Sequence, residues 1–359
     1  MDFMKDVTKE LEKAGIQVGA SEPPRYWFSS GNYVLNKTIS GSFYDAIPQG
    51  RVAAYVGPSS CGKSFLICNT LREAQAEGAY VVVLDSENAL DDDFVSKIGV
   101  DPKNNYFYAH IDTIPQCKKI ASKIINKYKA EYGKGNEDAP KMVIAIDSLN
   151  MLMTETEEKH FDSGVSRGDQ GQRNKQLKAM LRELVQAIKR ENISIVVSSH
   201  VYRNQDIMNG EGVWIVSEAI RYSLSQICLL TKLKLKDKND NRQVEGIRMK
   251  GEGYKTRFTK PFQSVTIEVP YDTGMDPYNG LLDVAISMDI CQRRGAWYQF
   301  GDDKFRRDDF SAQFGATVLG VCQDKRERYN LEAIMEGEEL DLTAGPSSKS
   351  MRQKKATSK

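Results

Sequence analysis

One stretch constrains this chain more than any other, because residues 57–64 carry the pattern G-x-x-x-x-G-K-S without a gap. The glycines of such a loop let successive backbone N–H groups point at one anion. Lys63 can then reach the β- and γ-phosphates of a nucleotide, and the Ser64 hydroxyl can ligate Mg²⁺. The pattern therefore predicts a loop that binds a nucleoside triphosphate. Its residues are Gly57, Pro58, Ser59, Ser60, Cys61, Gly62, Lys63 and Ser64.

The sequence on either side of this loop supplies the context that the motif requires, a strand before it and a helix after it. Residues 53–56 are apolar and predict a buried strand. Residues 65–76 place four apolar side chains at helical spacing, and Gly78 follows as a stop signal. A turn that binds nothing fits this context much less well.

Further apolar runs alternate with amphipathic segments along the chain. Residues 80–85, 142–146 and 193–197 are nearly continuous apolar runs, typical of strands buried on both faces of a parallel sheet. Residues 118–132 and 174–190 predict helices between them. The alternation predicts an α/β fold with a mainly parallel central sheet. Three later segments, joined by short polar turns, predict an antiparallel extension of the sheet: residues 225–236, 246–250 and 264–269.

These elements divide the chain into four predicted parts. Residues 1–34 form a short helix and linker, whose apolar stripe must dock on the core or on a neighbouring subunit. Residues 35–270 form the nucleotide-binding core, and residues 271–331 form a small C-terminal α+β domain. Residues 332–359 end in a segment rich in basic residues and predict a disordered tail.

Composition excludes several classes of protein. The 50 basic and 49 acidic residues nearly cancel, so any nucleic-acid surface must come from local clustering. The six cysteines are scattered and the three histidines are far apart, which implies neither disulfides nor a structural metal. No apolar run approaches the roughly 20 residues of a membrane span, and the charged N-terminus is unlike a signal peptide. We expect an intracellular protein without a membrane partner.

Polar residues follow the predicted strands at their carboxyl ends, where parallel sheets bind ligands. Asp147 ends one strand and suits the acid that holds Mg²⁺ beside Ser64, although Asp85 has a similar setting and is the alternative. Glu87 could orient or deprotonate an attacking water, or simply neighbour a helix start. His200 could sense the γ-phosphate, or be an ordinary hydrogen-bonding histidine.

With these residues assembled, the chain resembles the RecA family of recombinases, and within it the phage UvsX recombinases. The resemblance covers most of the chain, and its 272–283 motif is the most specific to the UvsX branch. It implies a RecA-type P-loop ATPase core with ATP and Mg²⁺ as cofactors. In chain order, the similar motifs are GPSSCGKS, LDSENALDDDF, VIAIDS, SSH, KTR at 255–257, DTGMDPYNGLLD at 272–283 and GAWY at 295–298.

The resemblance also implies roles for individual residues. Glu87 matches the catalytic base, and His200 matches the residue that couples the γ-phosphate to the DNA-binding loop. Phe94 matches an aromatic ring that stacks on adenine, although an aromatic side chain in a helix is more often part of a core. Lys255 and Arg257 match basic residues that reach the triphosphate of the next subunit, where cations stabilise the transferred phosphoryl group. Phe65, directly after the loop, is counted with the ATP-binding residues.

Two long segments after strands match the DNA-binding loops of the family, residues 154–173 and residues 201–218. Both combine glycines with basic or aromatic residues, which suits phosphate contact and base stacking. The first also holds five acidic residues, so composition alone would favour a solvated surface loop. The candidate DNA-contacting residues are Arg167, Arg173, Tyr202, Arg203 and Trp214.

The function expected from the resemblance is ATP-dependent DNA strand exchange by a filament formed on single-stranded DNA. The expected partners are single- and double-stranded DNA, further copies of the chain in a helical filament, a recombination mediator and single-stranded-DNA-binding proteins. The nearest alternative is a hexameric helicase on the same core. A small-molecule kinase and a regulatory paralogue that only mediates exchange are more distant alternatives.

Overall fold

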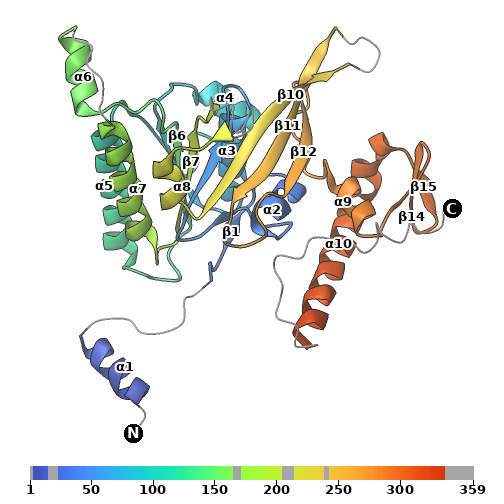
Figure 1. Cartoon of the computed structure of the whole chain (residues 1–359), viewed down its shortest axis with the longest axis horizontal. Helices are drawn as coiled ribbons and strands as arrows, with labels where there is room; N and C mark the ends of the chain where they lie inside the picture. Colours follow the sequence, from blue (N-terminus) through green and yellow to red (C-terminus); the bar gives the residue numbers. More distant parts are fainter. Residues whose placement is uncertain (1–2, 15–22, 165–170, 204–213, 238–241, 336–359) are drawn as a thin grey trace, which may run out of the picture.

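A computed structural model describes residues 3–14, 23–164, 171–203, 214–237 and 242–335 of the chain. Its centre is an eight-stranded sheet with the strand order β12-β11-β10-β3-β7-β6-β4-β5 (Figure 1). All pairings from β10 to β5 are parallel, which confirms the predicted α/β class. The strands are β3 (Val52–Val56), β4 (Tyr80–Asp85), β5 (Tyr106–His110), β6 (Met142–Asp147), β7 (Ile193–Ser199), β10 (Gln226–Lys236), β11 (Val244–Lys255) and β12 (Ser264–Pro270).

Helices cover both faces of this sheet, as the continuous apolar strands require. Alternate residues of each strand point to opposite faces, so neighbouring residues enter different cores. In β3, for example, Ala54 packs into one core and Tyr55 into the other. The first core is completed by α5 (Ile114–Tyr132), α7 (Gln172–Ile188) and α8 (Glu218–Ser223), and the second by α3 (Lys63–Ala76) and α4 (Asp92–Ile98).

The sheet continues beyond the parallel strands through an antiparallel ribbon. β10 pairs antiparallel with β11, and β11 with β12, as the later strand-like segments predicted. The far ends of β10 and β11 project past the parallel part of the sheet (Figure 1). In β10 the burial changes accordingly, from the fully buried Leu230 to the exposed Leu233.

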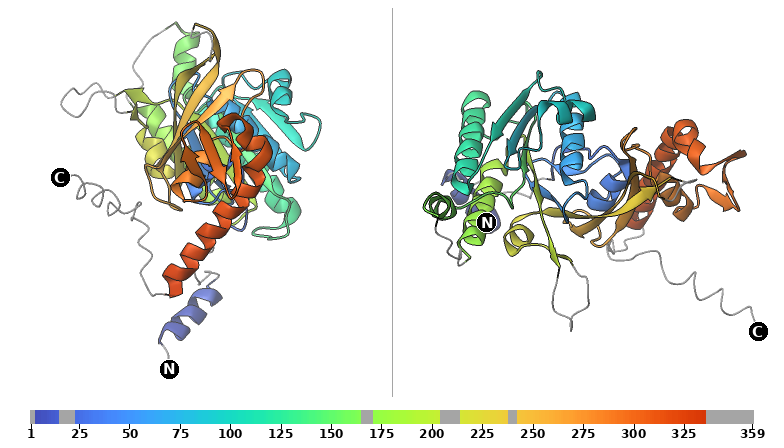
Figure 2. Two further views of the ribbon diagram at one scale, coloured as in Figure 1. Left: turned by 90° about the vertical axis from the view of Figure 1, so that its right-hand side faces the viewer. Right: turned by 90° about the horizontal axis from the view of Figure 1, so that it is seen from above.

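The C-terminal unit lies beside β12 at one end of the molecule, as Figure 1 and the right view of Figure 2 show. Its core also takes Val34 and Phe43 from the N-terminal part of the chain. Its elements are α9 (Leu281–Ser287), β13 (Gln292–Arg294), β14 (Trp297–Phe300), β15 (Asp303–Phe305), the 3₁₀ helix η2 (Arg307–Asp309) and α10 (Phe310–Met335). α10 continues past the predicted boundary at residue 331, and the rest of the predicted tail lies outside the described residues.

Short elements complete the N-terminal part. α1 (Phe3–Lys13) lies apart from the core in Figure 1, and its Phe3 and Met4 are largely exposed. β1 (Trp27–Phe28) and β2 (Ile47–Pro48) pair with each other. α2 (Tyr33–Ser40), which sequence reasoning did not predict, begins where the Asn32 side chain accepts the N–H groups of Val34 and Leu35. No helix in the described part of the chain is long and apolar enough to span a membrane.

Candidate functional site

The loop 57–64 joins β3 to α3 at the carboxyl edge of the parallel strands, as the motif predicts. Ser60 and Gly62 adopt positive φ angles of 56° and 95°, which wrap the backbone into a compact turn. Gly62 is the N-cap of the 14-residue helix α3 and supplies no side-chain cap. The first N–H groups of α3 are therefore not capped by a side chain, which suits a helix N-terminus that binds phosphate.

The Lys63 side chain lies over this loop and is 7% exposed. Its ammonium group donates to the carbonyl oxygens of Pro58 at 2.9 Å and Gly57 at 3.3 Å. Lys63 Nζ also lies 3.5 Å from His200 Nδ1. The structure therefore places the lysine of the loop beside the end of β7.

Asp147 ends β6 and is almost fully buried. Burial raises the pKa of this carboxyl, while hydrogen bonds from the Ser198 and Ser64 hydroxyls lower it and the negative charges of Glu87 and Asp85 raise it further. The Ser198 hydroxyl donates to Oδ1, and Oδ2 is buried with no such donor among the described residues. A buried carboxylate with a serine hydroxyl nearby is a donor set that fits Mg²⁺ and its water shell.

Asp85, the alternative for the same role, has its carboxylate fully engaged. Oδ1 accepts the backbone N–H groups of Glu87 and Asn88, and Oδ2 accepts those of Ala89 and Leu90, all at 2.8 to 2.9 Å. The Tyr108 hydroxyl donates to Oδ2 as well. Asp85 therefore shapes the loop that carries Glu87, and the geometry favours Asp147 as the residue for metal.

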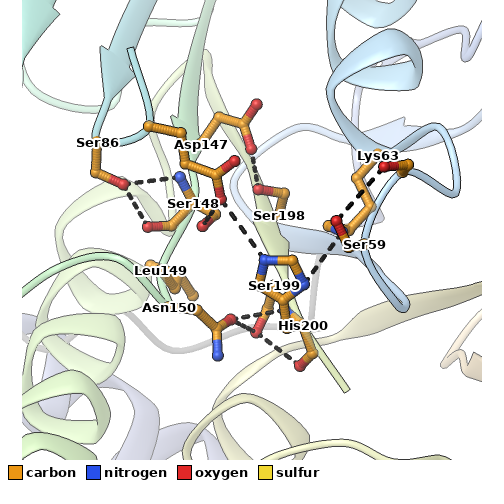
Figure 3. Close-up of polar contacts among 12 residues, drawn as sticks. Ser59, Lys63, Ser86, Asp147, Ser148, Leu149, Asn150, Ser198, Ser199 and His200 are labelled. Atoms are coloured by element: carbon orange, nitrogen blue, oxygen red, sulfur yellow. Dashed lines mark hydrogen bonds and ion pairs between the residues drawn. The ribbon is translucent and has the colours of Figure 1, made fainter. Parts of the chain in front are cut away.

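Glu87 reaches the same edge from the loop after β4. The Ser148 hydroxyl donates to Glu87 Oε1 at 2.5 Å, and His200 Nε2 lies 3.7 Å from the same oxygen. Ser86 fixes the neighbouring backbone, because its Oγ accepts the Ser148 N–H and donates to the Ser148 carbonyl. Figure 3 shows how these contacts join the ends of β4, β6 and β7 opposite Lys63.

The two aromatic candidates near the nucleotide loop are both partly buried. Phe65 lies in the first turn of α3 and Phe94 in α4, and both pack against the apolar core on that face of the sheet. The side chain of Asp91 caps α4 by accepting the Phe94 N–H at 2.7 Å. Phe94 therefore has a packing role, and its remaining exposed surface leaves room for a stacking role.

Lys255 and Arg257 do not join the cluster around Lys63 within one chain. Lys255 pairs with Ile227 near the start of β10, whereas the nucleotide loop follows the carboxyl end of β3. The Lys255 ammonium donates to the Arg221 carbonyl at 2.5 Å, and burial, with the nearby charges of Arg257 and Arg221, lowers its pKa. Arg257 is exposed in the turn between β11 and β12.

The prediction of one long loop at residues 154–173 is wrong in part. Thr154 begins helix α6 (Glu155–Asp162) with a capping box, in which its hydroxyl accepts the Glu157 N–H and the Glu157 carboxylate accepts the Thr154 N–H. Arg173 is the second residue of α7, and its guanidinium donates to the Leu152 carbonyl at 3.1 Å. Arg173 therefore stabilises the chain segment around Leu152. The other candidate, Arg167, lies outside the described residues.

The second predicted DNA segment is a short hairpin at its described ends. β8 (Tyr202–Arg203) pairs antiparallel with β9 (Trp214–Ile215), and residues 204–213 lie outside the described residues. The Tyr202 side chain is 56% exposed. The hairpin follows directly from the end of β7, where His200 lies.

Sequence reasoning missed a basic and aromatic groove between α7 and α8. Lys175, Lys178 and Arg182 line a hollow of about 420 Å³ with Tyr222, and no described lining residue is acidic. Lys178 Nζ lies 5.8 Å from the centre of the Tyr222 ring. The spacing i, i+3, i+7 of the three cations could have revealed one charged helix face.

Comparisons with known proteins agree with this architecture. A family model described as the RecA N-terminal domain matches residues 3–276. The chain is 25% identical to RecA of Treponema denticola over 276 residues, 77% of this chain and 62% of that protein. It is 26% identical to RecA of Aquifex aeolicus over 258 residues, 72% and 70% of the two chains. RecA of Mycoplasma mycoides is 24% identical over 305 residues, 84% and 83%.

The chain thus spans less than two thirds of the Treponema protein and more of the other two. The family match covers the nucleotide loop, all eight strands of the central sheet and the edge where Glu87, Asp147 and His200 meet. Because this match extends over most of the sequence, the chain belongs to the RecA family.

Proposed function

We propose that this protein is an ATP-dependent DNA strand-exchange recombinase that assembles on single-stranded DNA. The observation that carries the proposal is the convergence of Lys63, Glu87, Asp147 and His200 at one edge of the sheet. Membership of the RecA family and the names of the RecA relatives support the recombination role. The narrower similarity to the UvsX branch stays a prediction, and a phage-encoded member of that branch would act in the host cytoplasm.

The proposed nucleotide site uses the backbone of residues 57–64 to hold the phosphates. Lys63 would exchange its carbonyl partners for the β- and γ-phosphate oxygens, and Phe94 would contact the adenine. Ser64 and Asp147 would hold Mg²⁺ between them. When bound, the ion neutralises charge that develops on the phosphates.

Glu87 is the proposed base for hydrolysis. The Ser148 hydroxyl fixes one oxygen of its carboxylate, which leaves the other to orient a water. His200 lies within 4 Å of both Glu87 and Lys63, at 3.7 and 3.5 Å. It is therefore placed to respond when a γ-phosphate enters between the lysine and the carboxylate.

Lys255 and Arg257 are proposed to act on the nucleotide of a neighbouring subunit. Their position near the start of β10 keeps them from the loop of their own chain. A cation supplied by a second subunit would make hydrolysis depend on assembly. α1 supports assembly too, since its exposed apolar residues require a partner surface.

A groove at the sheet edge offers such a surface. It lies between α5 and the edge strand β5, has a volume of about 520 Å³, and is lined by five aromatic residues. An amphipathic helix such as α1 can lay its apolar side chains into an apolar groove. We propose that the N-terminal segment of another copy binds there.

DNA is proposed to bind over α7 and the β8–β9 hairpin. Lys175, Lys178 and Arg182 would contact phosphates, and the exposed Tyr202 would stack on bases. Arg203 and Trp214 lie on the same hairpin, and Arg167 precedes α7 in the sequence. Recombination mediators and single-stranded-DNA-binding proteins would act at this assembly step.

A homologous-pairing assay tests the proposal. Purified protein is mixed with ATP, Mg²⁺, circular single-stranded DNA and a homologous linear duplex, and joint molecules are resolved on a gel. We expect joint molecules with homologous duplex and none with a heterologous one. Unwinding of a forked duplex without pairing would identify a helicase instead, and ATP turnover indifferent to DNA would identify a metabolite kinase. DNA and ATP binding without joint molecules would identify a regulatory paralogue.

A further inference from the structure

We propose that Asn150 is a positioning residue that couples the nucleotide site to the DNA-binding hairpin. It does so by linking the chain after Asp147 to His200 and Tyr202 through a single side chain. This inference rests on the function proposed above, because it concerns how nucleotide binding alters DNA affinity. Neither the sequence motifs nor the catalytic cluster assigns a role to this residue.

Asn150 lies in the turn that follows β6, close to the proposed catalytic groups. It comes three residues after Asp147 and two after Ser148, whose hydroxyl holds Glu87. The side chain is partly buried and points at the end of β7, as Figure 3 shows. It is therefore attached to the strand that carries the proposed metal ligand.

The side-chain amide of Asn150 forms three hydrogen bonds to residues 199–202, at the end of β7 and the start of β8. Oδ1 accepts the Ser199 hydroxyl at 2.5 Å and the His200 backbone N–H at 2.6 Å. Nδ2 donates to the Tyr202 hydroxyl at 3.3 Å. Because a backbone N–H can only donate, the oxygen of the amide must face His200, and the nitrogen must then face Tyr202.

The segment that Asn150 holds is also in contact with the nucleotide loop. The Ser199 carbonyl accepts the Gly57 N–H at 3.1 Å, and the His200 ring lies between Lys63 and Glu87. Tyr202 begins β8 and so opens the hairpin proposed to contact DNA. One amide therefore contacts a residue that faces the phosphate and a residue that faces DNA.

The turn that carries Asn150 is itself firmly held. The Leu149 N–H donates to the Ser198 carbonyl at 3.0 Å, and Arg173 donates to the Leu152 carbonyl. Met153 is fixed on the other side by a bridge to Thr113. A shift of His200 on nucleotide binding must then change the hydrogen bonds of Asn150, because its own backbone does not follow freely. The Tyr202 hydroxyl shares that amide and responds to the change.

The test is the ratio of single-stranded-DNA dissociation constants measured with ADP and with a slowly hydrolysed ATP analogue. Fluorescence anisotropy of a labelled oligonucleotide gives both constants. Asn150→Leu keeps the size of the side chain and removes all three hydrogen bonds. We expect it to lower the ratio roughly tenfold, within the range typical of coupling between two sites. A merely structural role would weaken both constants equally and leave the ratio unchanged.

Two further variants complete the experiment. Tyr202→Phe keeps the ring and the exposed position but lacks the hydroxyl, so it tests the link even if Asn150→Leu folds poorly. We expect it to lower the ratio too, and the double variant to be no worse than Asn150→Leu alone. Asn136→Leu is the matched control, since Asn136 also bonds backbone groups, at residues 132 and 138.

The outcomes separate this inference from the function on which it rests. DNA binding by the unaltered protein with an unchanged ratio in both variants would overturn the role of Asn150 alone. Strictly additive effects of the two substitutions would also overturn it. Failure of the unaltered protein to bind DNA in either nucleotide state would overturn the proposed function together with this inference.

Discussion

The carboxyl edge of the parallel sheet and the outer surface of α7 carry two halves of the proposed activity, but they position their residues in different ways. At the edge, Asp147 and Glu87 follow buried strands, and several hydrogen bonds fix the chain around each of them. On α7, Lys178 and Arg182 project from an exposed helix face. A fixed edge suits chemistry that depends on geometry, and a set of exposed cations suits binding to a repeating polyanion.

The largest effect is expected from a change at the edge that keeps its shape. Glu87→Gln retains the size of the side chain and its bond from Ser148, but it cannot take a proton from water. We expect ATP turnover to fall about 100-fold, the scale of general base catalysis, while nucleotide and DNA affinities stay within about twofold. Phosphate release measures the turnover. Titration with a slowly hydrolysed ATP analogue and with DNA measures the affinities. Glu77→Gln, at an exposed ion pair with Lys141, is the control.

Parallel losses of turnover and nucleotide affinity in Glu87→Gln would contradict a catalytic role. Glu87 would then be a structural residue, and the distinction between edge and surface would weaken.

The next effect tests whether one subunit supplies every catalytic group of the site at the sheet edge. Arg257→Ala should lower turnover roughly tenfold in the assembled state, because the missing cation no longer stabilises the phosphoryl group of the neighbour. In dilute protein without DNA, where subunits are apart, the variant should match the unaltered chain. Turnover measured across protein concentration checks this, with Lys260→Ala in the same turn as control. An identical defect at all concentrations would rule out action between subunits.

A smaller effect is expected on the α7 surface. Arg182→Ala removes one cation from a set, so single-stranded-DNA affinity should fall a few-fold and the slope of log K against log salt should decrease by about one. Affinity for ATP should not change. Lys123→Ala, an exposed lysine on α5, is the control. A salt slope that stays the same in Arg182→Ala would show that the groove does not contact phosphate.

The smallest effect concerns stability and distinguishes the edge from an ordinary core. The pKa of Asp147 is raised on folding, so the folded chain binds a proton more readily than the unfolded chain, and stability falls as pH rises through that pKa. Without Mg²⁺ and nucleotide, Asp147→Asn should therefore raise the melting temperature by about 2–4 °C at pH 7. This gain in melting temperature should shrink toward acid pH. Calorimetry of both proteins across a pH series measures it. A lower melting temperature at pH 7 would show that the charge stabilises the empty site.

The same contrast explains how much the sequence predicts. Strand ends were predictable, because continuous apolar runs mark β4, β6 and β7 and their last residues must meet at one edge. The sequence favoured Asp147 over Asp85 but left Asp85 as an alternative, since both follow apolar runs, and the N–H groups around Asp85 reveal its role in the loop. The long helix α10 was missed, although Phe310, Phe314, Val318, Leu319 and Cys322 stand at helical spacing and pack into one core.

Exposed segments were harder to predict for a different reason. Arg173 and Lys178 are both basic residues on α7, yet one donates to carbonyls of its own chain and the other lines a groove. Composition does not distinguish these environments, because the difference lies in the backbone that folds beside each of them. The capping box of α6 was visible in the sequence as Thr154 followed by Glu157, but the many charged residues suggested a loop.

The proposed ATPase site is tested most directly by the rate of ATP hydrolysis with and without single-stranded DNA. We expect Mg²⁺-dependent turnover that rises at least several-fold when DNA is added and that Lys63→Ala abolishes, because the Lys63 ammonium group is the cation nearest the proposed phosphates. Turnover that is absent with DNA present, or that persists at a near-normal rate in Lys63→Ala, would contradict the proposed site.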